Sequence, residues 1–408
     1  MANTALLALA GLLVLAYLLD VFGRWSKLPS VVLLIATGMI ARQALDHFGV
    51  ELRFVDTLLP VIGTVGLILI VLEGTLDLEL RRERAGLIAR SSGAALLGFV
   101  VTLAAFTVLL HLLPGLEWTV AALAAMPFAV ISSAVAIPSA TGLPDASREF
   151  VVYESSLSDI IGVLVFYAWL AAGGALGEFA GDLFGGGALS LVAAIGVALL
   201  LFYLINRIEG HVRFVPLLAG LVLMYAAGKL LHLSPLVLVL VCGLLLNNPH
   251  LLHWNERLRA LHGPGYERTL DEFKGLVAEL TFATKSVFFI MLGYWTDVHH
   301  MTDWRSWAVA AAMVAIIYAS RAGILRLLGI DDVRRLVWLA PRGLITVLLF
   351  LAAADTGSLE AFPFGAVMLV VLVTATATAL AHRSAAAAGD PASTAAVQNE
   401  YPSDVTNP

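Results

Sequence analysis

Long apolar stretches follow one another along almost the whole chain, separated by short charged or Gly/Pro-rich segments. Most of them approach the roughly 20 residues with which an α-helix crosses the hydrocarbon core of a bilayer. The pattern predicts about thirteen transmembrane helices and no soluble domain between them. We place these helices at residues 4–22, 30–47, 57–78, 91–113, 118–143, 150–172, 188–206, 213–233, 235–246, 271–295, 304–328, 335–354 and 362–381.

The composition agrees with a membrane protein. Of the 408 residues, 60% are hydrophobic and 13% are charged, whereas soluble domains carry roughly 25% charged residues. We expect an all-α polytopic membrane protein with one transmembrane domain over residues 1–383 and a disordered cytoplasmic tail over residues 384–408. Because no nucleophile–base pair or metal-ligand set falls on facing helices, we do not expect an enzyme. We also expect no cofactor and no nucleic-acid partner.

The loops predict the orientation. Lys and Arg accumulate in the cytoplasmic loops of membrane proteins, and here they follow mainly the odd-numbered helices. This distribution predicts a multi-pass protein of the plasma membrane with its N-terminus outside and its C-terminus in the cytoplasm. The basic residues concerned are Arg24, Lys27, Arg81, Arg82, Arg84, Arg90, Arg148, Arg207, Arg257, Arg259, Arg268, Arg334 and Arg383.

An odd helix count suggests two inverted six-helix repeats, helices 1–6 and 8–13, joined by helix 7. In transporters built this way, interrupted helices at matching positions of the two halves indicate the binding site. Helix 5 contains Pro127 and Pro138, and helix 12 contains Pro341 and Gly343. Since proline removes a backbone donor and glycine loosens a helix, we expect helices 5 and 12 to be discontinuous and to cross. Two ordinary proline kinks are the alternative.

Several ionisable side chains fall inside the predicted helices, where each needs a partner, a water-filled cavity or a function. At about 1.5 Å of rise per residue, Asp159 lies roughly 13 Å along its helix, close to the bilayer centre. Glu154 and Arg321 fall at one depth in the inner leaflet, which predicts a structural ion pair between them. The remaining ionisable residues are Glu73, Lys285 and Arg342.

A carboxylate beside a water-filled cavity can bind either a hard monovalent cation or a proton. Competition between the two for Asp159 is a sufficient mechanism for exchange across the membrane. Two structural interpretations stay open at this point. Lys285, which approaches the level of Asp159, could pair with it, and Glu73 could lie at the membrane interface if its helix ends early.

Taken together, these residues resemble the monovalent cation:proton antiporter superfamily, the sodium/proton exchangers, from about Leu28 to the end of helix 13. Residues 154–159 read Glu-Ser-Ser-Leu-Ser-Asp, where the electroneutral branch of the family ends its helix-6 motif in Asn-Asp and the electrogenic branch in Asp-Asp. Residues 72–74, Leu-Glu-Gly, are similar to the helix-3 acidic motif of the electroneutral branch. Residues 321–322, Arg-Ala, and 340–343, Ala-Pro-Arg-Gly, are similar to its helix-11 arginine and helix-12 break.

The resemblance implies an antiporter with Na+ and H+ as partners, a core of helices 4–6 and 11–13 that moves against a scaffold, and a homodimer in the lipid bilayer. It implies Na+ at Asp159, Ser155 and Glu73, with further ligands near Ser132 and Ser133.

Ser158 departs from the family motif. Residues 132–134 (Ser-Ser-Ala) and Lys285 are more similar to the electrogenic branch, whereas the other matches favour the electroneutral branch. Selectivity among Na+, K+ and Li+ stays open. A K+ efflux channel or transporter on the same scaffold and a sensor that no longer transports are the rival interpretations.

Overall fold

The regular elements of the described residues are all helices, which confirms the all-α class. The computed structural model describes residues 2–26, 28–49, 54–140, 143–175, 177, 192–200, 214–230, 235–252, 266–296, 301–330, 332–359 and 361–387. The predicted helix at 188–206 is described only over 192–200, where it is helical. The predicted tail lies outside the described residues beyond residue 387.

The long helices follow the predicted apolar stretches closely. By length and composition, six helical stretches of the described chain can cross a membrane, and several shorter apolar helices accompany them. The helices before the first break are α1 (Ala2–Ser26), α2 (Ser30–His47), α3 (Phe54–Leu76) and α4 (Ala85–Leu112), with the 3₁₀ turn η1 (Arg82–Arg84) before α4. Those after it are α7 (Asp145–Ala171), α10 (Phe214–Leu230), α11 (Pro235–Asn247), η3 (Pro249–Leu252), α13 (Tyr266–Trp295), α15 (Trp304–Leu327) and α18 (Gly365–Ala387).

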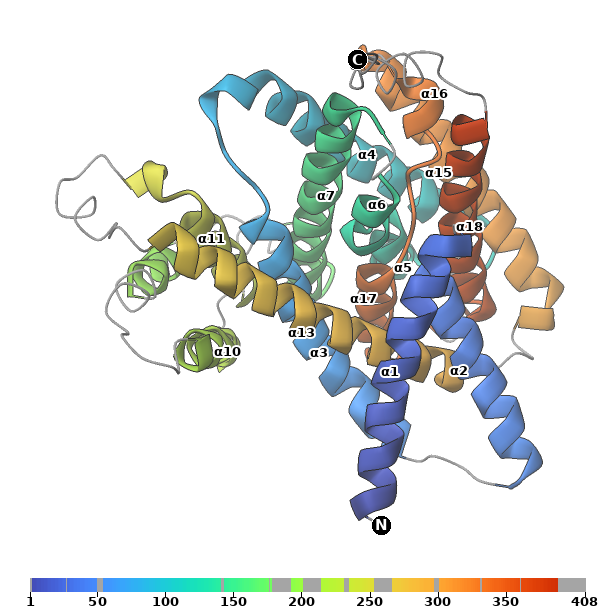
Figure 1. Cartoon of the computed structure of the whole chain (residues 1–408). Helices are drawn as coiled ribbons and strands as arrows, with labels where there is room; N and C mark the ends of the chain where they lie inside the picture. The colour runs from blue at the N-terminus through green and yellow to red at the C-terminus, as the bar shows by residue number, and fades with distance from the viewer. Residues whose placement is uncertain are drawn as a thin grey trace, which may run out of the picture.

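Two helices are interrupted. The fifth predicted helix consists of α5 (Trp118–Ala129) and α6 (Ser133–Ser139), and the twelfth consists of α16 (Val333–Leu336) and α17 (Leu344–Ala354). In Figure 1, α5 lies below α6 whereas α16 lies above α17, so the chain passes through the two interrupted helices in opposite directions. This is the inverted arrangement that the odd helix count suggests.

The prolines flank the first break rather than occupying it. Pro127 lies inside α5 and Pro138 inside α6, and the extended residues 130–132 lie between them. A tertiary contact holds the extended segment, because the backbone N–H of Ser132 donates to the carbonyl oxygen of Pro341 at 2.9 Å. The position of the break therefore depends on this contact with the second interrupted helix, and not only on the backbone hydrogen bonds that the prolines cannot donate.

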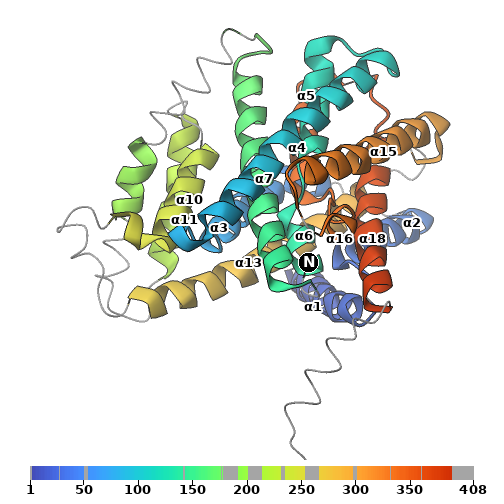
Figure 2. The same ribbon diagram turned by 90° about the horizontal axis from the view of Figure 1, so that it is seen from above.

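The remaining helices surround this crossing. Seen from above, α10 and α11 lie at one edge of the molecule, while α15 and α18 lie at the other side of α7 (Figure 2). Helix α13 packs along α2 and α3. At the α2–α13 contact, a Cβ on Gly38 would lie 2.0 Å from the carbonyl oxygen of Ile290, and a Cβ on Gly293 would lie 2.1 Å from that of Ile35. Small residues let these backbones meet, as is common between membrane helices.

Candidate functional site

The two interrupted helices touch at their breaks, and glycines make the approach possible. A Cβ on Gly343, before α17, would lie 2.6 Å from the hydroxyl oxygen of Ser132. A Cβ on Gly162 of α7 would lie 2.1 Å from a methyl group of Val130. The second break and α7 therefore both pack directly onto the extended segment 130–132. Side chains of α7 beside this segment can therefore reach backbone groups of the break that lack helical hydrogen-bond partners.

Asp159 has such a side chain. Its side chain projects from α7 and is 4% exposed. Oδ2 accepts the backbone N–H of Ser133 at 3.1 Å, at the first turn of α6, where helix N–H groups lack intrahelical partners. Oδ1 is buried and finds no hydrogen-bond partner in the described residues. A carboxylate with one oxygen anchored and one open is able to bind a further cation or proton.

Several serines lie close to Asp159 along α7 and in the neighbouring break. The Ser158 hydroxyl accepts the backbone N–H of Ile131 at 2.9 Å, so it satisfies a donor of the break. The Ser155 hydroxyl donates to the carbonyl oxygen of Val151 at 2.7 Å. The Ser132 hydroxyl is buried and, within the described chain, has no partner.

Ser156 is a candidate that the sequence analysis missed. Its hydroxyl is buried and unpartnered among the described residues. It lies three positions before Asp159, which places both residues on one face of α7. A Cβ added to Gly74 of α3 would lie 3.8 Å from the Ser156 hydroxyl oxygen, so Ser156 faces α3. The helical spacing from Asp159 was the available signal, but only the packing shows that this face meets α3.

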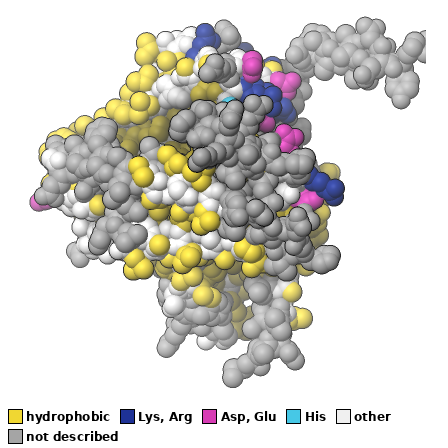
Figure 3. Space-filling model, turned by 90° about the vertical axis from the view of Figure 1, so that its left-hand side faces the viewer, with side chains coloured by type: hydrophobic (Ala, Val, Ile, Leu, Met, Phe, Trp, Pro, Cys, Tyr) yellow, Lys and Arg dark blue, Asp and Glu magenta, His cyan; other side chains and the backbone are white. Residues whose placement is uncertain are grey.

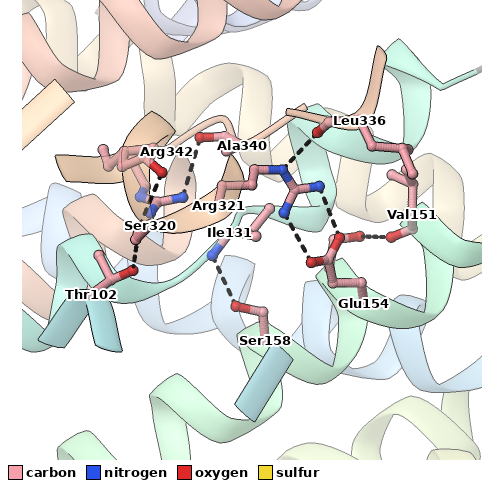
Figure 4. A network of polar contacts seen from close by, with 12 residues as sticks. Thr102, Ile131, Val151, Glu154, Ser158, Ser320, Arg321, Leu336, Ala340 and Arg342 are labelled. Atoms are coloured by element: carbon pink, nitrogen blue, oxygen red, sulfur yellow. Dashed lines mark hydrogen bonds and ion pairs between the residues drawn. The ribbon is translucent and has the colours of Figure 1, made fainter. Parts of the chain in front are cut away.

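Glu154 and Arg321 form a buried bidentate ion pair (Figure 4). Both nitrogen–oxygen distances are 2.9 Å, and the side chains of Glu154 and Arg321 are 3% and 5% exposed. Arg321 also donates from Nε to the carbonyl oxygen of Leu336 at 2.6 Å, at the end of α16. The pair thus joins α7 to α15 and holds the C-terminal end of α16.

Arg342 holds the other side of the crossing. Its guanidinium donates from Nε to the carbonyl oxygen of Phe128 at 2.6 Å and from Nη1 to that of Ala340 at 3.2 Å. Its backbone N–H donates to the Thr374 hydroxyl at 3.0 Å. Since Phe128 lies in the last turn of α5, the guanidinium carries positive charge to the negative end of that helix.

Glu73 and Lys285 are close enough for their charges to interact, apart from these contacts. Glu73 is half-buried on α3, and its carboxylate interacts with the Thr281 hydroxyl and with the charge of Lys285, both on α13. The Lys285 ammonium lies 5.8 Å from the ring centre of Phe282. In the described structure, the carboxylate of Asp159 interacts with Ser133 and not with Lys285. The structure therefore brings Asp159, Ser132, Ser133 and Ser158 together and places Lys285 beside Glu73.

Removing one member of the Glu154–Arg321 pair should destabilise the protein strongly. We expect Glu154→Gln to lower the free energy of unfolding by about 3–5 kcal/mol, because it leaves the Arg321 charge buried without its partner. Thermal unfolding midpoints in lipid nanodiscs measure the effect.

The matched control is Glu149→Gln, which breaks the more exposed Arg84–Glu149 pair and should cost no more than about 1 kcal/mol. Equal midpoint shifts for the two variants would show that the buried pair contributes no more to the stability of the fold than the exposed pair does.

Comparison with known proteins is consistent with this architecture. The chain is similar to the sodium proton antiporter MjNhaP1 from Methanocaldococcus jannaschii at pH 8, with 18% identity, a TM-score of 0.74, and coverage of 93% of this chain and 96% of that one. A structure of MjNhaP1 from an electron-microscopy map gives a TM-score of 0.69 at 18% identity, covering 94% and 98% of the two chains. These likenesses show the fold.

No curated protein matches the chain in sequence. The family model described as "Sodium/hydrogen exchanger, transmembrane" matches residues 10–382, nearly the whole chain. The chain therefore belongs to the sodium/hydrogen exchanger family.

Proposed function

We propose that this protein is a secondary antiporter that exchanges Na+ for H+ by competition at Asp159. The observation that carries the proposal is the open Oδ1 of a buried carboxylate at the crossing of two broken helices. Family membership supports antiport of a cation and protons, and the structurally similar MjNhaP1 is a sodium proton antiporter.

The oxygen-rich surroundings of Asp159 favour a hard cation. Such ions take carboxylate, hydroxyl and carbonyl oxygens as ligands. Within the proposal, Asp159 Oδ1 supplies the charge, and the hydroxyls of Ser132 and Ser156 supply neutral oxygens. Ser155 keeps a free lone pair after donating to Val151, and Glu73 precedes Gly74, the residue of α3 that Ser156 faces. A proton on Asp159 removes the charge that holds the cation, so the two ions exclude each other.

The charges around the crossing favour exchange of one cation for one proton. Glu154 is neutralised by Arg321. Ser158, next to Asp159, cannot ionise and instead binds the Ile131 N–H. Among the described residues, Asp159 is then the one carboxylate of the crossing that is free to change partners, and one negative charge binds either one Na+ or one H+.

We further propose that the core, α4–α7 with α15–α18, moves against a scaffold of the other helices to give alternating access, and that the scaffold forms a homodimer. The Ser156–Gly74 contact lies on the boundary between α7 of the core and α3 of the scaffold. Movement along this boundary changes which side of the membrane the Asp159 carboxylate faces.

The proposed orientation in the plasma membrane places the basic end in the cytoplasm. Arg84 pairs with Glu149 at 3.1 Å, and Ser147 donates to Asp332 at 3.2 Å, so the N-terminal ends of α4, α7 and α16 lie at one end of the molecule. In Figure 3, most of the charged side chains that can be seen lie toward the upper right of the visible face, and apolar side chains are spread over the described parts elsewhere. The basic residues of these segments are Arg81, Arg82, Arg84, Arg148, Arg334 and Arg335.

Asp159→Asn tests the proposal directly. In proteoliposomes with a pH-sensitive dye, we expect Na+ to collapse an imposed pH gradient with the wild type and to leave it intact with the variant, because the neutral amide supplies no negative charge to hold the cation and releases no proton. Asp145→Asn, at the exposed start of the same helix, should transport like the wild type.

A response to K+ or Li+ alone would change the ion assigned to the site. Cation current without proton movement would favour a channel, and no response to any cation in the wild type would favour a sensor.

Competition also predicts a pH dependence. The apparent KM for Na+ should rise as the pH falls, by up to about tenfold per unit, because one proton displaces one cation. The initial rate of Na+-dependent proton flux, measured over a range of Na+ concentrations at several pH values, gives this KM. A KM that stays constant while the maximal rate falls would contradict competition at one carboxylate.

Ser156→Ala tests the ligand that the structure adds. The apparent KM for Na+ should rise by about ten- to a hundredfold, since the loss of a contact with a charged group costs about 1.5–3 kcal/mol. Ser91→Ala is a matched control, because the Ser91 hydroxyl is also buried without a partner in the described structure but belongs to α4. If the two variants behave alike, Ser156 is not a ligand.

A further inference from the structure

A small cavity lies between α4, α15, α7 and the crossing. The volume open to the centre of a water molecule is about 20 Å³, and one bound water needs roughly 10–15 Å³ on this measure. Asp159 is not among the lining residues, so the cavity is separate from the proposed cation site. Residues of α4 and α15, apolar and polar, form most of its wall, and residues of α7 and of the two breaks complete it.

Two of these polar groups have unused donors. The Ser158 oxygen accepts the Ile131 N–H, and within the described residues its own proton meets no acceptor. Arg342 is 2% exposed, and of its five side-chain N–H groups only those on Nε and Nη1 donate to carbonyl oxygens in the described chain. Buried donors without acceptors are costly, and most of all those of a charged group.

Other groups on the wall offer acceptors. Glu154 lines the cavity, and each of its oxygens keeps a lone pair after binding Arg321. The hydroxyls of Thr102 and Ser320 lie 3.2 Å apart, and Ser320 also donates to the Ile317 carbonyl oxygen at 3.1 Å. When Ser320 donates to Ile317, Thr102 donates to Ser320, and the remaining lone pairs of both hydroxyls are free.

We propose that this cavity is a water site that completes the hydrogen bonding of Arg342 and Ser158. The charges on the wall select the ligand: the guanidinium groups of Arg321 and Arg342 repel a cation, and the Glu154 carboxylate repels an anion. A water molecule both donates and accepts, as this mixed wall requires. The site rests on the contacts of the crossing and does not depend on which ion the protein carries.

The water links groups that otherwise lack a common partner. Figure 4 shows Arg342, Ser158, Glu154 and the Thr102–Ser320 pair arranged around one region of the crossing. By accepting from Arg342, the water stabilises a buried positive charge that has no carboxylate partner in the described chain. Because a water molecule is not covalently bound to the protein, it can change its hydrogen-bond partners. The two breaks can then shift slightly relative to α4 and α15 while the donors of Arg342 and Ser158 keep an acceptor.

X-ray radiolytic footprinting tests the site, since hydroxyl radicals formed from a bound water oxidise the side chains beside it. We expect Phe99, which lines the cavity and is 2% exposed, to be oxidised several-fold faster than Phe106, which is buried on the same helix away from the cavity. The readout is mass spectrometry of the protein in nanodiscs. Equal rates for Phe99 and Phe106 would overturn the proposal.

Two variants and a control complete the experiment. Gly98→Leu adds a bulky side chain at a residue that lines the cavity, and we expect a several-fold loss of Phe99 oxidation. Gly323→Leu adds the same bulk to an exposed glycine of α15 that does not line the cavity, and should change nothing. Thr102→Val keeps the shape and removes an acceptor, so it provides a second test if Gly98→Leu does not fold. Phe99 oxidation that persists in every folded variant also overturns the proposal.

Discussion

The structure depends on satisfying the ends of two broken helices inside a bilayer. No lipid group can pair the backbone donors and acceptors that a break exposes, so the protein must supply partners for them. Three of the four ends meet a charged side chain: Asp159 accepts from the start of α6, Arg342 donates to the end of α5, and Arg321 donates to the end of α16. The signs are those that the helix dipole favours.

This arrangement explains why the crossing can hold a cation. The backbone engages one oxygen of Asp159 and leaves the other open, so the residue that stabilises the break also provides a binding group. Glu154 and Arg321 neutralise each other and fix α7 against α15. Their mutual neutralisation leaves the Glu154 carboxylate close to the crossing but already paired. Under the proposed function, the change of charge during a transport cycle is therefore confined to Asp159.

The packing around the crossing is not uniform. At the α2–α13 contact, the backbones at Gly38 and Gly293 approach so closely that no side chain fits between them. At the α3–α7 boundary, Ser156 presents to Gly74 a buried hydroxyl that has no partner among the described residues. Tightly packed glycines favour rigid attachment, whereas polar groups with spare hydrogen-bonding capacity tolerate a change of partner. Under the proposed function, the difference separates a fixed scaffold from a moving core.

The sequence by itself determined the features that depend on single stretches of chain. Apolar length indicated the membrane helices, and the count with its Pro/Gly signals indicated two interrupted helices. The depth of each charge put Glu154 and Arg321 at one level, where the structure pairs them. Only the tertiary structure decided which groups meet across helices: Lys285 lies beside Glu73, Ser156 faces α3, and the first break lies at residues 130–132. Helical spacing fixes the depth and approximate face of a side chain, but its partner depends on how the helices rotate and cross, which is set by packing between segments far apart in the chain.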